Sequence, residues 1–281
     1  TTDRSHKVSL KEAVLKGMPP DGGLYLPESS PVMPDKFFQD LPEMTFQSVS
    51  YEIAKALLGG DVPSDVLQKI IVEALNFETP LVAISEKTKT LELFHGPTLA
   101  FKDVGARFMS RLMAYFIRND CRELTILVAT SGDTGSAVAD GFAGLDNIDV
   151  ILLYPKGKVS SVQERQLIVE RKGVKSFAVE GTFDDCQRMV KEAFVDPRLA
   201  HLPLSSANSI NIGRLLPQSL YYLWSVAQTG LKEVNFCVPS GNLGNLCGGM
   251  FASLVGQPVN KFIAAHNSNH FFPDFLSAKV D

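Results

Sequence analysis

The feature that most constrains the fold of this chain is a regular alternation of short apolar runs and amphipathic segments after residue 90. Continuous apolar runs predict buried strands, and apolar residues at a spacing of three or four predict helices. We expect strands over residues 124–129, 150–154, 174–179 and 234–238. We expect helices between them over residues 134–144, 162–172 and 183–195. This alternation predicts an α/β fold with parallel sheets that helices cover on both faces.

The first third of the chain has a different pattern. Residues 46–58 have helical spacing and end at two glycines, and Ser64 has the character of an N-cap for a second helix over 65–75. With residues 1–45, these helices indicate an N-terminal lobe. A long helix is also expected over 212–228, near the other end of the chain.

Lys102 lies in an unusual local setting. An apolar run at 91–94 predicts a strand, a Gly-Pro pair breaks it, and helical spacing resumes over 101–118. The lysine is therefore expected on the first turn of a helix, where the helix dipole and partial burial lower the pKa of an ammonium group. A lysine that forms a Schiff base needs such an amine. The alternative is a surface lysine paired with Asp103. His95, beside this turn, is a packing residue or an acid–base candidate.

Two further turns have the character of anion sites. Residues 127–137 and 236–245 each read as an apolar strand, a turn rich in Gly, Ser, Thr or Asn, and the start of a helix. Neither turn has the spacing of a Walker loop or of a Rossmann glycine motif. One amine-bearing turn and two anion turns are what pyridoxal phosphate and an amino-acid substrate require together.

Four segments, 9–28, 95–102, 130–135 and 206–218, resemble the threonine synthase family of the long-chain bacterial and fungal type. The resemblance covers essentially the whole chain. It implies fold type II of the pyridoxal-phosphate enzymes, which is similar to the tryptophan synthase β subunit. In that fold, two mostly parallel sheets are covered by helices, and an extra N-terminal lobe is expected here.

The resemblance also implies a domain division. It implies an N-terminal lobe over 1–85, a large cofactor-binding domain over 86–119 and 211–281, and a small mobile substrate domain over 120–210. Relatives normally continue well past the expected strand at 262–265, so we expect the C-terminal part of the large domain to be missing. The residue that faces the pyridine nitrogen is then expected to lie beyond Asp281.

Family roles carry over to named residues. The resemblance implies that Lys102 binds the cofactor and then moves protons. It implies a cofactor-phosphate loop made of Ser240, Gly241, Asn242, Leu243, Gly244 and Asn245. It implies a turn around the substrate α-carboxylate made of Thr130, Ser131, Gly132, Asp133 and Thr134. It implies a site for the substrate phosphate made of Asn208, Ser209 and Arg214. A guanidinium suits a bidentate phosphate contact, although an arginine on a helix surface is the alternative.

The implied reaction converts O-phospho-L-homoserine and water into L-threonine and phosphate, the last step of threonine biosynthesis. A phospho-lyase that gives 2-oxobutyrate from the same substrate is the nearest alternative. A catalytically silent, ligand-binding homologue is another. Product analysis separates the first two, because only the synthase adds water at Cβ.

Composition fits this interpretation. The chain has 281 residues, of which 45% are hydrophobic, and a net charge of −4, so no basic surface for nucleic acid is expected. No run is long enough for a membrane span, and the polar start does not resemble a signal peptide. The four cysteines are expected to be reduced, with those at 237 and 247 in apolar settings, which favours the cytoplasm. The oligomeric state stays open.

No metal is expected. His266 and His270 are four residues apart, a spacing that could bind zinc on a helix. The asparagine-rich segment between them favours a loop, and no glutamate follows in a metalloprotease pattern. Arg107 and Lys156 are expected to have structural roles, and Asp184 and Asp185 to lie in the first turn of a helix.

Overall fold

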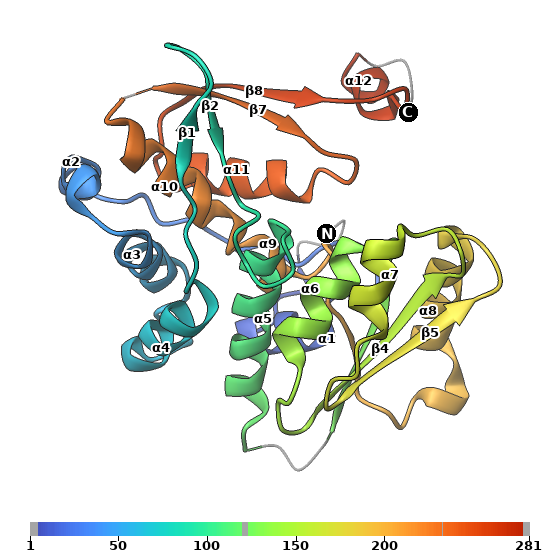
Figure 1. Cartoon of the computed structure of the whole chain (residues 1–281). Helices are drawn as coiled ribbons and strands as arrows, with labels where there is room; N and C mark the ends of the chain where they lie inside the picture. The colour runs from blue at the N-terminus through green and yellow to red at the C-terminus, as the bar shows by residue number, and fades with distance from the viewer. Residues whose placement is uncertain (1–4, 120–122, 232, 278–281) are drawn as a thin grey trace.

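The computed structural model describes residues 5–119, 123–231 and 233–277, and its larger sheet follows the expected alternation (Figure 1). This sheet has the strand order β5-β4-β3-β6, and all neighbouring strands are parallel. Its strands are β3 (Leu124–Ala129), β4 (Ile148–Pro155), β5 (Val174–Val179) and β6 (Leu204–Ser206). The expected strands at 124–129 and 174–179 have the observed bounds.

Helices cover both faces of this sheet because strand β3, inside the sheet, has apolar side chains on both faces. Side chains of a strand alternate between the two faces. Leu127 packs into a cluster with α8 (Phe183–Val195), whereas Val128 belongs to the main core together with residues of α6 (Asp133–Phe142). The acidic first turn expected for α8 is confirmed. A capping box between Thr182 and Asp185 caps the N-terminus of this helix.

The second parallel sheet has two strands, β7 (Val234–Pro239) and β8 (Val259–Ala265). It packs near α10 (Gln218–Thr229) and α11 (Gly244–Leu254), at the top of Figure 1. Aromatic rings from α10, β7 and β8 pack against one another, namely those of Tyr222, Phe236 and Phe262. The described residues therefore contain the two parallel sheets that the resemblance implied.

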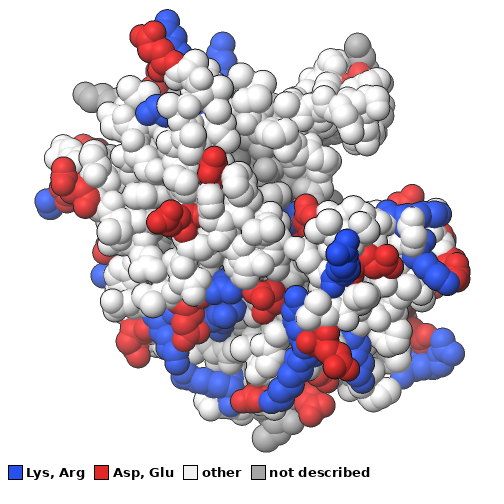
Figure 2. Space-filling model, viewed as in Figure 1, with Lys and Arg blue, Asp and Glu red and all other residues white. Residues whose placement is uncertain are grey.

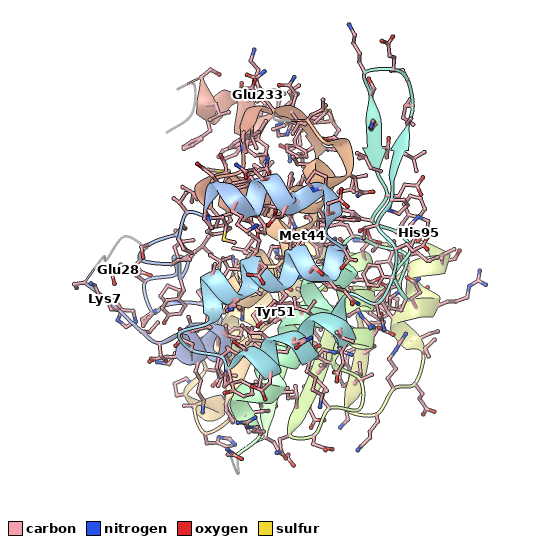
Figure 3. All side chains as sticks on the ribbon, turned by 90° about the vertical axis from the view of Figure 1, so that its left-hand side faces the viewer. Lys7, Glu28, Met44, Tyr51, His95 and Glu233 are labelled. Atoms are coloured by element: carbon pink, nitrogen blue, oxygen red, sulfur yellow. The ribbon has the colours of Figure 1, made fainter. Side chains whose placement is uncertain are left out.

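The N-terminal residues form a separate layer of helices. Figure 3 shows α2 (Asp35–Asp40), α3 (Phe46–Leu58) and α4 (Ser64–Ala74) stacked in order. Thr45 caps α3 as its side chain accepts a hydrogen bond from the Ser48 N–H. The expected N-cap role of Ser64 is wrong. Pro63 is the N-cap, and Ser64 is the first helical residue.

The expected strand over 91–94 is mostly wrong. The chain forms an antiparallel hairpin of β1 (Leu81–Ala83) and β2 (Lys89–Leu91), and the second strand ends where the prediction began. The next pair in register would join Glu92 to Pro80. The Glu92 N–H donates to the Pro80 carbonyl at 3.0 Å, but proline has no N–H to donate in return. The ladder therefore stops at this proline.

The expected long helix over 212–228 is divided into α9 (Ile212–Leu215) and α10. Pro217 lies at the division and is the N-cap of α10. Proline lacks the N–H that would continue the ladder, and its ring clashes with the preceding turn. The break leaves α9 as one short turn that carries Arg214.

The other elements lie near their expected bounds where a prediction exists. The lysine helix α5 (Lys102–Ile117) agrees within one residue at each end, whereas α7 (Ser161–Ile168) ends four residues early. The remaining elements are α1 (Leu10–Lys16), η1 (Leu41–Glu43), η2 (Pro197–Leu199) and α12 (Phe271–Leu276).

The described cysteines differ in exposure. Cys186 is buried and Cys247 half-buried, but Cys237 is exposed, so the expectation of an apolar setting is wrong for Cys237. All three are free thiols, and Cys121 lies outside the described residues. Within the described ranges, no helix has the length and apolar character needed to cross a bilayer.

Candidate functional site

Lys102 is the first residue of α5 and is half-buried. Burial lowers the pKa of its ammonium group below the ordinary value for lysine, Arg214 lowers it further, and Asp133 partly opposes both. The direction agrees with the sequence prediction, and its main cause is desolvation. Such an amine gives up its proton more easily than a surface lysine and is a better nucleophile.

Asp103 is not the partner of Lys102. Its side chain is fully buried, and both carboxylate oxygens accept hydrogen bonds from Thr98, one from the main-chain N–H at 2.9 Å and one from the hydroxyl at 2.6 Å. Burial raises the pKa of this carboxyl, and the two bonds oppose that shift. The alternative of a surface ion pair is therefore wrong. Asp103 instead braces the lysine turn, which we define as residues 96–101.

Gly96 shows how tightly this brace is packed. A Cβ added to Gly96 would lie 2.5 Å from Oδ2 of Asp103 and 2.9 Å from its Cβ. The buried carboxylate thus takes the space that a side chain at residue 96 would need. The lysine turn is held in one shape by a side chain from the helix that it precedes.

The β3–α6 turn, residues 130–134, is organised by Thr130. This side chain is buried, and its hydroxyl oxygen accepts from the N–H groups of Gly132 and Gly135 at 3.1 and 2.8 Å. The hydroxyl also donates to the Gly132 carbonyl. Thr130 therefore faces into its own turn, while Ser131 is exposed and Asp133 begins α6. An anion at this turn would meet the start of a ten-residue helix.

One pocket joins the lysine to residues from distant parts of the chain. Its lining residues are Phe101, Lys102, Gly105, Ser209, Arg214, Gln218, Asn242 and Asn245. Five of these were predicted as site residues from sequence. The eight lining residues come from the start of α5, from α9 and the segment before it, from the start of α10, and from the loop after β7 and the first turn of α11. Figure 2 shows the molecular surface hollowed between the upper part, which carries β7 and β8, and the part that carries α7 below it.

Arg214 is buried, with 2% of its surface exposed. Its Nη1 donates to the Ala207 carbonyl, and burial lowers the pKa of the guanidinium to about 10, partly opposed by Asp103. The alternative of a helix-surface arginine is wrong. A guanidinium has five N–H donors, so this buried cation has donors in excess of that one bond in a pocket shared with Lys102.

Asn208 and Ser209 lie next to this arginine in sequence and contribute polar atoms. The buried Oδ1 of Asn208 has no hydrogen-bond partner among the described residues. The Ser209 hydroxyl accepts a bond of 3.3 Å from Nδ2 of Asn242, which connects this segment to the loop after β7. A buried polar atom without a partner is costly, and because this amide oxygen is an acceptor, its partner would have to be a hydrogen-bond donor.

The loop after β7, residues 240–245, is folded by its own side chains. The Ser240 hydroxyl accepts from the Leu243 N–H at 3.0 Å, and Oδ1 of Asn242 accepts from the Gly244 N–H at 3.2 Å. A Cβ on Gly241 would meet no atom within 4 Å, whereas one on Gly244 would lie 3.2 Å from Cβ of Ser209. The loop thus has open space over Gly241, shortly before the start of α11, where a phosphate could approach the main chain.

Sequence reasoning missed four residues of this region. Phe101, Gly105 and Gln218 line the pocket, and Gln163, on α7, lies against the β3–α6 turn. Gln218 belongs to the segment 206–218 that carried the resemblance, and its Nε2 donates to the Arg214 carbonyl at 3.1 Å. That position in the motif could have identified it. Gln163 gave no local signal, because it lies on another helix 30 residues beyond the turn it contacts.

The other candidates lie outside the pocket. His95 is paired with Glu92 at 2.7 Å, beside the hairpin in Figure 3. His266 lies in a loop as expected, and His270 is paired with Asp274. The described part of the chain has no group of three potential metal ligands.

The two cations expected to be structural are both paired. Arg107 bonds Asp140 and main-chain carbonyls of the α4 end, and Lys156 pairs with Glu180 on the surface.

Comparison with known proteins gives two matching family models. The model described as "Threonine synthase N terminus" matches residues 1–75. The model described as "Pyridoxal-phosphate dependent enzyme" matches residues 72–279. Together the two models span nearly the whole chain.

Three relatives illustrate the similarity. Threonine synthase of Haemophilus influenzae is 43% identical over 276 residues, which make up 97% of this chain and 64% of that protein. The crystal structure of threonine synthase from Escherichia coli matches with a TM-score of 0.91 and 40% identity, over 99% of this chain and 66% of that one. The crystal structure of threonine synthase with bound PLP from Brucella melitensis matches with a TM-score of 0.86 and 36% identity, over 92% and 57%. The chain thus spans about 64% of the length of the curated relative.

Proposed function

Because this chain belongs to the family of pyridoxal-phosphate-dependent enzymes, we propose that it converts O-phospho-L-homoserine and water into L-threonine and phosphate. The cofactor is pyridoxal 5′-phosphate. The observation that carries the proposal is the pocket shared by Lys102 and Arg214, which combines an amine of lowered pKa with a buried guanidinium. The first suits an aldehyde, and the second suits a phosphate group.

The described residues fit this cofactor. Nζ of Lys102 would hold it covalently, and those main-chain N–H groups of residues 240–245 that do not donate to Ser240 or Asn242 would bind its phosphate in the open space over Gly241. Ser240 and Asn242 would keep that loop in shape through the bonds that they accept from the Leu243 and Gly244 N–H groups, and Asn245 accepts from the N–H of the residue that follows the loop. When bound, pyridoxal phosphate supplies a sink for electrons released at the substrate's α- and β-carbons.

The chain's own groups would bind and orient the substrate. The β3–α6 turn would receive the α-carboxylate, and Arg214 with Asn208 and Ser209 would hold the phosphate until it leaves. A cation and hydrogen-bond donors in a water-poor pocket stabilise the charge that grows on a departing phosphate. The amine of Lys102, once free of the cofactor, would take protons from the substrate carbons and return them.

We also propose the domain division implied by the resemblance. Residues 1–85 would form an N-terminal lobe, residues 86–119 and 211–281 the large domain, and residues 120–210 a small mobile domain. The proposal is supported by the four-stranded sheet, whose described strands all come from 124–206. Closure of the small domain would bring the β3–α6 turn toward Lys102.

The proposed partner is a small phosphorylated amino acid and not a nucleic acid, and the proposed location is the cytoplasm. Free thiols at Cys186 and Cys247 support a reducing compartment.

The proposal is tested by incubating the cofactor-loaded protein with O-phospho-L-homoserine and measuring both products. Release of phosphate with an equal amount of L-threonine is expected, and Lys102→Ala should abolish both. Phosphate with 2-oxobutyrate would indicate the phospho-lyase, which similarity to curated threonine synthases does not favour. A protein that binds the cofactor but releases no phosphate would refute the proposed activity.

A further inference from the structure

The side chain of Gln163, on α7, lies directly against the β3–α6 turn. A Cβ added to Gly132 would lie 2.4–2.6 Å from the carbon, nitrogen and oxygen of the Gln163 carboxamide. Gly132 also has a φ of +141°, which residues other than glycine rarely adopt. Because Gly132 has no side chain, the turn leaves a space beside it, and the carboxamide of Gln163 fills that space.

Neighbouring groups fix which way this carboxamide points. The Ser160 hydroxyl donates to Oε1 of Gln163 at 3.0 Å, and its oxygen accepts from the Gln163 N–H at 3.3 Å. Nε2 donates to Oδ1 of Asp133 at 2.5 Å. Because the acceptor Asp133 lies on one side and the donor Ser160 on the other, the hydrogen-bond network determines which amide atom is nitrogen.

One N–H donor of the Gln163 carboxamide has no acceptor among the described residues. A carboxamide NH₂ group has two N–H donors. Asp133 takes one of them, and Nε2 has no second acceptor among the described residues. The unused donor lies at the turn proposed to receive the substrate α-carboxylate.

The charge of Asp133 gives this donor a specific use. Asp133 places a carboxylate on the same turn, and two carboxylates close together repel each other. A NH₂ group between them can donate one hydrogen to each and so lower the cost of bringing the second carboxylate in. The same helix reaches the other side of the site, since Nε2 of Gln166 donates to the Thr98 carbonyl of the lysine turn at 3.3 Å.

We propose that Gln163 is a substrate-binding residue, whose amide nitrogen bridges Asp133 and the α-carboxylate of the amino-acid substrate. This inference rests on the proposed function, since it assumes an amino-acid substrate at the β3–α6 turn. It adds a residue from α7 to a site otherwise made from the turn itself, and it assigns Asp133 the role of orienting that residue.

The test compares two ligands that differ only at the carboxylate. L-Threonine and L-threoninamide are titrated into the cofactor-loaded protein, and their dissociation constants are measured by calorimetry for the wild type, Gln163→Met and Gln163→Glu. Methionine keeps the length of the side chain without its donors, and glutamate keeps the shape but adds a charge. Arg165→Gln is the matched control, because it makes the same change of charge as Gln163→Glu at an exposed position of the same helix.

A hydrogen bond to a charged group is worth enough to change affinity by about ten- to a hundredfold. Gln163→Met should weaken L-threonine binding by about that factor and Gln163→Glu by more, while L-threoninamide binding changes by less than about threefold. Arg165→Gln should bind both ligands as the wild type does.

Equal losses for both ligands would overturn the inference, because a merely structural role of Gln163 does not distinguish a carboxylate from an amide. Wild-type affinity of both Gln163 variants for L-threonine would overturn it as well. If one variant fails to fold in a thermal melt, the other decides the matter. A wild-type protein that binds neither ligand would instead refute the proposed function, and the inference with it.

Discussion

Replacing Arg214 by leucine should remove phosphate binding while leaving the protein about as stable as before. The guanidinium is buried, and that burial lowers its pKa to about 10. This lowering of the pKa corresponds to about 3 kcal/mol by which folding disfavours the charged form. Because Arg214 is a base whose pKa falls on folding, this cost is fully present below about pH 10, and it disappears only as the pH rises from the folded-state pKa toward the ordinary pKa of arginine.

Leucine removes that cost but leaves the Ala207 carbonyl without its buried donor, which costs about 1–3 kcal/mol. The two effects nearly cancel, so we expect the free energy of unfolding of Arg214→Leu to lie within about 2 kcal/mol of the wild-type value. Catalytic efficiency should fall about thirtyfold to a thousandfold, which corresponds to about 2–4 kcal/mol of lost transition-state stabilisation.

The assay is thermal denaturation of the cofactor-loaded protein at neutral pH with increasing inorganic phosphate, so that the proposed cofactor-phosphate loop at residues 240–245 is already occupied. A ligand at a hundred times its dissociation constant stabilises the native state by about 2.7 kcal/mol. The melting temperature of the wild type should rise with phosphate, and that of Arg214→Leu should not. Arg107→Leu is the contrasting control. It removes bonds to Asp140 and to main-chain carbonyls, so it should lower stability but keep the response to phosphate.

An Arg214→Leu protein that phosphate stabilises as much as it does the wild type would refute this reasoning. So would a loss of stability of more than about 4 kcal/mol, because it would show that the buried cation supports the fold.

Three other substitutions test the rest of the site. Lys102→Ala should lose the covalent attachment of cofactor that borohydride makes permanent in the wild type, as peptide mapping would detect; a label on another lysine would contradict the assignment. Gly241→Val should weaken cofactor retention on dialysis at least tenfold with little change in melting temperature, because its side chain enters open space. Gly244 is a poorer choice, since a Cβ there would meet Ser209. Gly96→Ala should destabilise the protein by about 1–3 kcal/mol in urea unfolding, because its Cβ would overlap the Asp103 carboxylate; unchanged stability would show that the lysine turn yields easily.

The elements predicted well from sequence are those whose boundaries are set locally. Strands β3 and β5 and helices α3 and α8 have the expected bounds, because apolar patterning and capping residues determine both ends. The misplaced boundaries depend on partners elsewhere in the chain. The end of β2 is set by Pro80 on the opposite strand, which a reading of residues 91–94 alone does not include. Pro217 gave a local signal, but the apolar pattern continued past it.

The lowered pKa of Lys102 followed from its place on the first turn of a helix, whereas Arg214 was singled out by the resemblance, and the roles of both residues stay predictions. What patterning does not reveal is which surface a side chain faces. Cys237 is exposed on β7 while its neighbour Val238 is buried, since alternate side chains of a strand face opposite ways. Gln163 illustrates the same limit, because its contact with Gly132 depends on how α7 packs across the end of the sheet.

The close contact between Gly96 and Asp103 has a consequence for how such a sequence can change over generations. A side chain at residue 96 is harmful as long as Asp103 is present, because the two would overlap. A smaller residue at 103 is also harmful, because Thr98 loses its acceptors and Gly96 has no side chain to fill the vacated space. Each change alone is harmful, whereas the pair made together can fill the space again. The two positions are therefore expected to be epistatic, and a double-mutant cycle between them should be strongly non-additive. Evolution could replace this arrangement only through an intermediate sequence of lower stability. That barrier would preserve the lysine turn even where the residues that set the specificity of the pocket change.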